Sequence, residues 1–188
     1  MSNNEMTTGG TNAAAATLAS MTVESLRDLL QDAGYRVETV GEGRARFLRS
    51  ASNRFAFDIR PGSAIPGTTD RFADVAFVAL LAVQGTLPLD LINRWNCTRR
   101  FGRLFLDQTI PGQDFLVLSM DSSFAGGVSA QQMRVQVEIW DSLLQQFVPW
   151  LREELSKVAP KIDAVAAPAS AENTTPSAEA PVPAGAAA

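Results

Sequence analysis

The amino-acid sequence predicts an α+β domain with two layers, a mostly antiparallel sheet with helices on one face. Two segments with helical apolar periodicity lie far apart in the chain, near residues 22–34 and from residue 129 onward. Between them, short alternating segments are joined by connections too short for a crossover, which makes neighbouring strands antiparallel. The chain has 188 residues, of which 46% are hydrophobic, enough to bury one core of ordinary size.

The first helix is predicted directly after a polar lead. Residues 1–20 are small and polar without periodicity, and we expect them to be disordered. Thr22 is a suitable N-cap, Glu24 suits the first turn, and Gly34 supplies the C-terminal cap. The apolar face of this helix consists of Val23, Leu26, Leu30 and Ala33.

Four strands are expected next. Alternation predicts strands over 35–40, 45–48 and 55–59 as an antiparallel meander. The run over 72–83 is apolar on both faces, so a central strand and a buried helix both fit its periodicity. Its aromatic and valine content favours the strand.

A short helix and a hairpin are predicted in the middle of the chain. Pro88 suits the first helical turn, and Asn96 tolerates the left-handed geometry that ends a helix. Strands over 101–107 and 115–120 then form a hairpin closed by Pro111-Gly112. The apolar face of the short helix consists of Leu89, Ile92 and Trp95, with Leu91 beside them.

The last helix follows Gly126-Gly127 and carries a long apolar stripe. Ser129 and Gln132 suit a capping box, and Pro149 predicts a kink or break that leaves Trp150 exposed. The element order is therefore α-β-β-β-β-α-β-β-α in a domain over residues 21–158, and an Ala/Pro-rich tail over 159–188 is expected to be disordered. The stripe consists of Met133, Val137, Trp140, Leu144, Phe147 and Leu151.

A family resemblance rests mainly on the segment Asn93-Arg94-Trp95-Asn96 and the following Arg99-Arg100-Phe101-Gly102-Arg103. These residues resemble the signature of the YbjN family of bacterial sensory-transduction regulators, whose fold is similar to that of the type III secretion chaperones. The resemblance covers about residues 21–155 and implies a type III secretion chaperone-like fold and a homodimer. Cys97 departs from the pattern, which has a charged or polar residue at this position. The segments that extend the resemblance are Ala33-Gly34-Tyr35, Phe55-Ala56-Phe57 and Gly126-Gly127-Val128-Ser129.

Composition excludes several classes of function. The chain has no His and one Cys, so a His-based triad, a His-metal site and an intramolecular disulfide are excluded. We predict no catalytic residue, no metal and no cofactor, and expect that the protein is not an enzyme. The net charge of −4 disfavours nucleic acid. With neither a secretory signal nor a membrane-spanning run in the sequence, we expect a cytoplasmic protein with no membrane partner.

The arginine-rich segment after the short helix is the candidate site. Its guanidinium groups suit a carboxylate, a phosphate or an acidic peptide. The favoured function is a non-enzymatic protein-binding module, chaperone-like or regulatory, that engages a segment of a partner protein; the alternative is a sensor of a small anionic ligand. A purely structural reading pairs the arginines with Asp90, Asp107, Asp121 or Glu138. The candidate binding residues are Arg94, Trp95, Asn96, Arg99, Arg100, Phe101 and Arg103.

Overall fold

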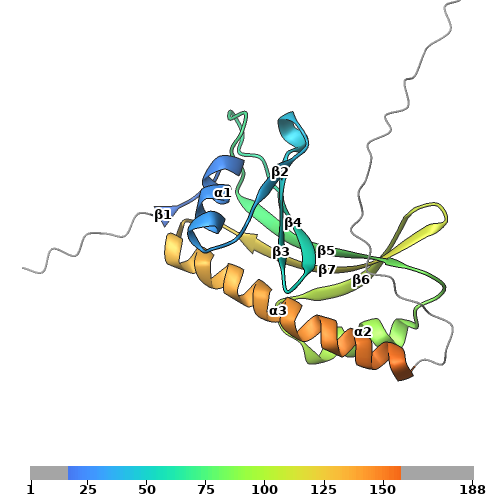
Figure 1. Cartoon of the computed structure of the whole chain (residues 1–188). Helices are drawn as coiled ribbons and strands as arrows, with labels where there is room; N and C mark the ends of the chain where they lie inside the picture. The colour runs from blue at the N-terminus through green and yellow to red at the C-terminus, as the bar shows by residue number, and fades with distance from the viewer. Residues whose placement is uncertain (1–16, 158–188) are drawn as a thin grey trace, which may run out of the picture.

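The computed structural model describes residues 17–157, an α+β domain with three helices packed against a six-stranded sheet (Figure 1). The predicted class and the order α-β-β-β-β-α-β-β-α are confirmed, with two short strands and one 3-10 turn added. The helices are α1 (Val23–Asp32), α2 (Leu89–Thr98) and α3 (Ala130–Lys157), and the 3-10 turn is η1 (Gly43–Ala45).

The main sheet has the strand order β2-β3-β4-β5-β7-β6, and all of its neighbouring pairs are antiparallel. Its edges are β2 and β6. Two further short strands, β1 and β8, pair with each other next to the start of α3. The strands are β1 (Thr17–Leu18), β2 (Glu38–Val40), β3 (Phe47–Ser52), β4 (Phe55–Pro61), β5 (Asp74–Val83), β6 (Arg103–Ile110), β7 (Gln113–Ser123) and β8 (Val128–Ser129).

The apolar run in the middle of the sequence is the central strand β5, not a buried helix. It pairs with β7 along its whole length and with β4 over Val75–Val78. Val75, Phe77 and Ala79 are buried on the face that α3 covers. Residues on its other face are only half-buried, yet apolar, which explains why the sequence shows no alternation here.

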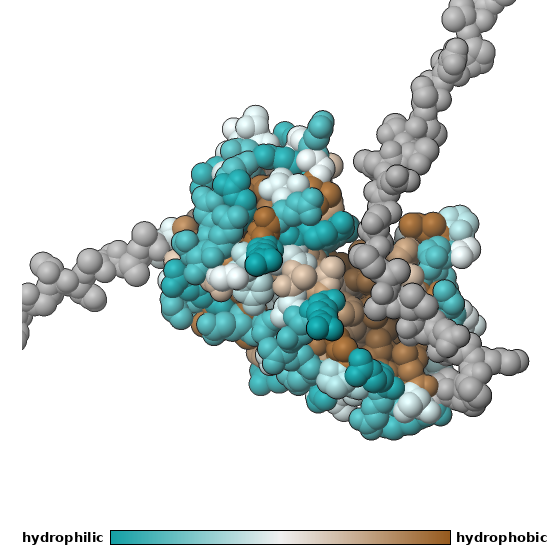
Figure 2. All heavy atoms as spheres, in the orientation of Figure 1, coloured by the Kyte–Doolittle hydropathy of each residue, from teal (hydrophilic) through white to brown (hydrophobic). Residues whose placement is uncertain are grey.

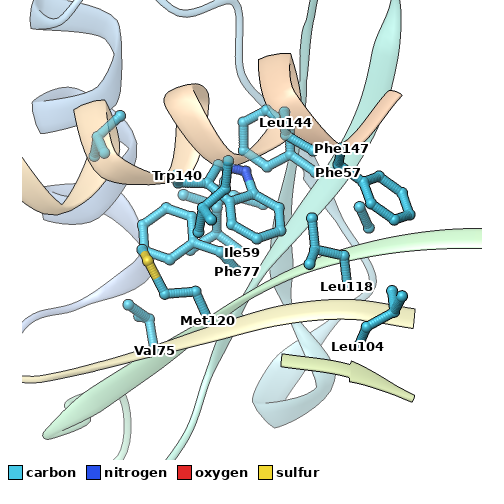
Figure 3. Close-up of a cluster of buried hydrophobic side chains, with 14 of the residues drawn as sticks. Phe57, Ile59, Val75, Phe77, Leu104, Leu118, Met120, Trp140, Leu144 and Phe147 are labelled. Carbon is cyan, nitrogen blue, oxygen red and sulfur yellow. The ribbon is translucent and has the colours of Figure 1, made fainter. Parts of the chain in front are cut away.

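The core lies between α3 and this face of the sheet. Trp140 of α3 is fully buried, with ring centroids 5.7 Å from both Phe57 of β4 and Phe77 of β5. Figure 3 shows this indole among side chains from α3, β4, β5 and β7. The predicted stripe on the last helix is confirmed, since Met133, Val137, Trp140, Leu144, Phe147 and Leu151 are all buried.

The first helix begins at the predicted N-cap, Thr22, and its capping box is completed by a serine. The Thr22 hydroxyl accepts a hydrogen bond from the Ser25 backbone N–H at 3.1 Å, and the Ser25 hydroxyl accepts one from the Thr22 N–H at 3.0 Å. A serine therefore fills the place of the longer acidic or amide side chain of the usual capping box. Gly34 has a φ of 89°, as expected for a residue just after a helix.

Several details of the helices differ from expectation. Asn96 does not end the short helix, which runs to Thr98, and Leu89 is 68% exposed instead of buried. Of the kink or break expected at Pro149, the break does not occur, because α3 continues to Lys157. Trp150 is half-buried and packs on Trp95, with ring centroids 4.9 Å apart, because α3 continues past the proline and meets α2.

The predicted disordered lead and tail fall largely outside residues 17–157. Of the lead, Thr17–Leu18 lie in the described part and form β1, paired with Val128–Ser129. Met21 and Phe72 exchange backbone hydrogen bonds of 3.0 Å, which also joins the start of the domain to the segment that leads into β5. Among residues 17–157, no helix is both long enough and apolar enough to cross a membrane.

Candidate partner-binding surface at the α2–β6 junction

Asn96 fixes how α2 lies against β6. Its side-chain amide donates to the Leu104 carbonyl at 2.9 Å and accepts from the Leu104 N–H at 2.8 Å. The carboxamide therefore occupies the place that a neighbouring strand would take along the outer edge of β6. Asn96 is a positioning residue: its two hydrogen bonds to Leu104 fix the end of α2 relative to the start of β6.

Trp95 and Gly102 attach the turn to the core. Trp95 is fully buried, and its indole N–H donates to the Gly102 carbonyl at 3.2 Å. A side chain at Gly102 would place its Cβ 3.0 Å from Leu143 and 3.3 Å from Leu118. A side chain at Gly102 would therefore require Leu143 and Leu118 to shift by a few tenths of an ångström, and glycine avoids this shift.

Phe101 is displayed to solvent by a strained turn. The Gly102 N–H donates to the Arg100 carbonyl at 2.9 Å, which closes a three-residue γ-turn with Phe101 at its centre. The φ of Phe101 is 70°, a left-handed value that bulky residues rarely adopt. Its side chain is 63% exposed, and the Arg100 guanidinium lies 5.2 Å from its ring centroid.

The predicted arginine cluster is divided among separate partners. Arg94 pairs with the buried Glu154 of α3 at 2.7 Å, and Arg103 pairs with Asp121 of β7 at 2.8 Å. Of the four acidic partners considered from the sequence, only Asp121 pairs with one of these arginines among the described residues. Glu154 was missed, because nothing local marks a carboxylate that lies 60 positions away in the chain.

Arg99 and Arg100 differ from their neighbours. Within residues 17–157, neither forms an ion pair with a carboxylate. The Arg99 guanidinium lies 5.6 Å from the ring centroid of Trp95, and its Nε is buried with no acceptor among the described residues. Both side chains thus rest on aromatic rings, an arrangement that leaves their charge available to a partner.

Glu154 of α3 forms ion pairs with Arg94 of α2 and with Lys157 of α3. Its carboxylate accepts from Lys157 at 3.0 Å and from Arg94 at 2.7 Å. Hydrogen bonds from Lys157, then from Arg94, hold the pKa of Glu154 below its ordinary value. The carboxylate is therefore charged at neutral pH and fixes the Arg94 guanidinium against α3.

The exposed large hydrophobic side chains are distributed along α2, β6 and the turn between them. Those identified among the described residues all come from α2, β6 or the turn between them, and include three that the sequence did not single out as a surface. The sequence feature that these residues share is their place in α2, in the edge strand β6 or in the turn between the two. They are Leu89 (68% exposed), Phe101 (63%), Phe105 (39%) and Ile110 (55%).

A hollow of about 820 Å³ lies elsewhere, between the α1–β2 connection and β3. Tyr35 and Asp141 line it, and burial together with the Asp141 carboxylate raises the pKa of Tyr35 to about 12. None of the seven predicted binding residues lines this hollow. Within residues 17–157, no group of acidic or cysteine side chains is close enough to hold a metal ion.

Comparison with known proteins concerns the family and the fold of the chain. The model of the family YbjN, described as "Putative bacterial sensory transduction regulator", matches residues 22–153. Among solved structures, the chain is similar to the crystal structure of YbjN, "a putative transcription regulator from E. coli", with a TM-score of 0.51 and 19% identity over 65% of this chain and 84% of that one. No curated protein matches. The fold and the family match together show that the chain belongs to the YbjN family.

Proposed function

We propose that this protein is a non-enzymatic regulatory module that binds a segment of a partner protein through the turn around Phe101. The observation that carries the proposal is the exposed, left-handed Phe101. A strained residue in a well-packed structure costs stability, and such residues cluster at binding sites. An exposed aromatic ring flanked by an arginine is also a common centre of protein interfaces.

The surroundings of the turn support a binding role. Asn96, Trp95 and Gly102 anchor the turn from three sides, so Phe101 and Arg100 are presented on a rigid base. A rigid site loses little conformational entropy when a partner binds. The description of the YbjN family as a regulator supports a regulatory role, and the proposed location is the cytoplasm.

The test is capture of partners by the tagged full-length protein from native lysate. Phe101→Asn removes the aromatic ring and keeps a residue that tolerates positive φ. The matched control is Arg54→Gly, which relieves a positive φ of 66° in the β3–β4 turn, away from the junction. We expect Phe101→Asn to lose the captured partner and Arg54→Gly to retain it. Equal capture by the wild type and Phe101→Asn would contradict the proposal.

A second candidate function is a sensor of a small anionic ligand. The observation that favours it is the Arg99 Nε, which is buried without an acceptor among the described residues, beside Arg100. Because the Arg99 guanidinium lies over Trp95, an anion bound there would change the indole fluorescence. Titration with nucleotides and acidic metabolites tests this candidate, with Arg99→Ala as the negative control. A fluorescence change that persists in Arg99→Ala would contradict it.

A further inference from the structure

Among residues 17–157, the outer edge of β6 is covered by Asn96 at one end and has no strand beside it further along. Both backbone groups of Leu104 bond to the Asn96 side chain, so they point away from β7. Backbone groups alternate in direction along a regular strand, which places the N–H and C=O of Leu106 on the same outer edge. Figure 1 shows β6 diverging from α2 beyond this point, toward the β6–β7 turn.

The open part of the edge ends at an irregularity. The pairing of β6 with β7 shifts between Asp107 and Ile110, and the Thr109 N–H donates to the Asp107 carboxylate at 3.0 Å. The regular accessible edge is therefore short: it is centred on Leu106 and ends at Asp107. Short edges flanked by bulges are less prone to non-specific pairing than long flat ones.

Apolar side chains accompany the open edge on both sides of the sheet. Phe105 is 39% exposed on the face away from the helices, and Leu106 is partly buried on the helix side. Figure 2 shows hydrophobic surface gathered where β5, β6 and β7 pass the C-terminal part of α3. A strand added to this edge would place its alternate side chains against these residues.

The charge of the β6–β7 hairpin is entirely negative between residues 104 and 120, where Asp107 and Asp114 are the only charged residues. Hydrogen bonds from Thr109 hold the pKa of Asp107 below its ordinary value, so this carboxylate is charged at neutral pH. Asp114 accepts from the Gln108 side chain at 2.9 Å. The nearby Arg103 guanidinium lies 6.0 Å from the ring centroid of Phe105 and pairs with Asp121 at 2.8 Å, so the carboxylate of Asp107 is the charge left for a partner strand beside Leu106.

A second copy of the chain fits this edge poorly. An antiparallel self-pairing centred on Asp107 sets Leu106 opposite residue 108 of the other copy and places the two Asp107 carboxylates directly opposite each other. Like charges in that position destabilise a strand pair. A shift in one direction brings in Leu104, whose backbone groups are already bonded to Asn96, and a shift in the other direction brings in Ile110, which lies beyond the irregularity of β6.

We propose that the β6 edge around Leu106 binds an extended segment of a different protein that carries a lysine or arginine opposite Asp107 and apolar residues beside it. This inference rests on the proposed function, and it specifies the partner segment. Backbone hydrogen bonds to the N–H and C=O of Leu106 supply affinity, as in other cases of strand addition. The basic residue opposite Asp107 and an apolar residue facing Phe105 supply selectivity.

The test uses two fluorescein-labelled peptides and the full-length protein, with binding followed by fluorescence anisotropy. The first peptide has the sequence Thr-Val-Lys-Val-Thr-Val, and the second has glutamate in place of lysine. We expect the lysine peptide to bind the wild type at least about tenfold more tightly, as expected for about 1.4 kcal/mol of discrimination. Asp107→Lys should reverse the preference, and the matched charge change Asp70→Lys, in the exposed β4–β5 loop, should leave it unchanged.

Hydrogen exchange separates strand addition from simple charge attraction. On addition of the lysine peptide, the Leu106 amide should gain protection, whereas the Leu104 amide, already bonded to Asn96, should not change. Equal binding of both peptides, or no added protection at Leu106, would overturn the inference. So would concentration-dependent dimerisation of the wild-type protein that Asp107→Lys abolishes, because it would identify a second copy as the occupant.

The two proposals can fail separately. In one outcome, Phe101→Asn loses partner capture, Asp107→Lys retains it, and the peptides bind without selectivity. This outcome would support the binding module and contradict the role of the β6 edge. Unchanged capture in Phe101→Asn, with loss in Asp107→Lys and selective peptide binding, would instead move the site from the turn to the edge.

Discussion

At the scale of single residues, Phe101 combines two properties that do not stabilise the fold, a strained backbone and an exposed aromatic ring. Its backbone lies in the left-handed region while its ring stays 63% exposed, so it adds strain without filling the core. Asn53 and Arg54 share positive φ values, but in a two-residue β-turn where that geometry is common. Strain outside such a turn, combined with an exposed aromatic ring, is the basis of the proposed binding role of Phe101.

We expect Phe101→Asn to stabilise the domain while it impairs binding. Asparagine adopts left-handed geometry with less strain, so the free energy of unfolding should rise by about 1 kcal/mol. Chemical denaturation of the wild type and the variant measures the difference. A variant that unfolds more easily would show that the ring packs on the domain.

Glu154 should make stability sensitive to acid. Its folded pKa lies below its ordinary value of 4.5, so its contribution is present above about pH 4.5 and is lost as the pH falls through the folded pKa. Glu154→Gln should therefore be less stable than the wild type at pH 7, and the difference should shrink as the pH is lowered below 4.5. Denaturation curves at several pH values measure this. A difference that does not change with pH would contradict the role of its charge.

Neutralising Arg99 and Arg100 together should leave the fold intact. The carboxylates that pair at this junction do so with Arg94 and Arg103, so the double change to alanine leaves no described carboxylate without its partner. Only stacking on Trp95 and Phe101 is lost, about 0.5–1 kcal/mol for each cation–π contact. Thermal melts check this, with Arg94→Ala as the comparison, which should lower the melting temperature more. The reverse order would contradict the assigned pairs.

At the scale of elements, α3 holds the sheet through one continuous apolar stripe. The helix passes Pro149 without ending, and this lets Trp150 meet Trp95 of α2. The same helix thus packs on the sheet through Trp140 and on α2 through Trp150 and Phe147. It links the core to the base of the candidate binding surface.

Trp140→Ala should destabilise the domain by about 3–5 kcal/mol, as truncation of a fully buried aromatic residue does. Trp150→Ala should cost less, because that side chain is only half-buried. Urea denaturation of both variants measures the two losses. Equal losses would show that α3 depends as much on α2 as on the sheet.

At the scale of the whole molecule, residues 17–157 contain a complete core. The buried hydrophobic residues lie between Met21 and Leu151, and β1 adds its pairing with β8. We expect a chain trimmed to residues 17–157 to melt within a few degrees of the full-length protein. Calorimetry of both chains checks this. Loss of cooperative melting in the trimmed chain would show that a terminal segment packs on the domain.

Most of the fold could be predicted because periodicity is a local property. The shared face of Phe55, Phe57 and Ile59 in β4 and the stripe from Met133 to Leu151 each reflect one element against one core, so the sequence carries them directly. The bounds of β3 differ from the prediction, since the strand runs over Phe47–Ser52 and not over 45–48. Errors arose where tertiary contacts overrule local preference. Pro149 stays helical because α3 is held by the packing of Phe147 and Leu151 on either side of it.

The candidate site shows the same division. The sequence by itself determined that Arg94 to Arg103 form an unusual junction between a helix and an edge strand, since residue types and their spacing are local. Only the tertiary structure decided that Arg94 pairs with Glu154, that Asn96 closes the edge of β6 at Leu104, and that Phe101 faces solvent. These outcomes depend on groups brought together from distant parts of the chain, and no local pattern encodes which distant partner a side chain meets.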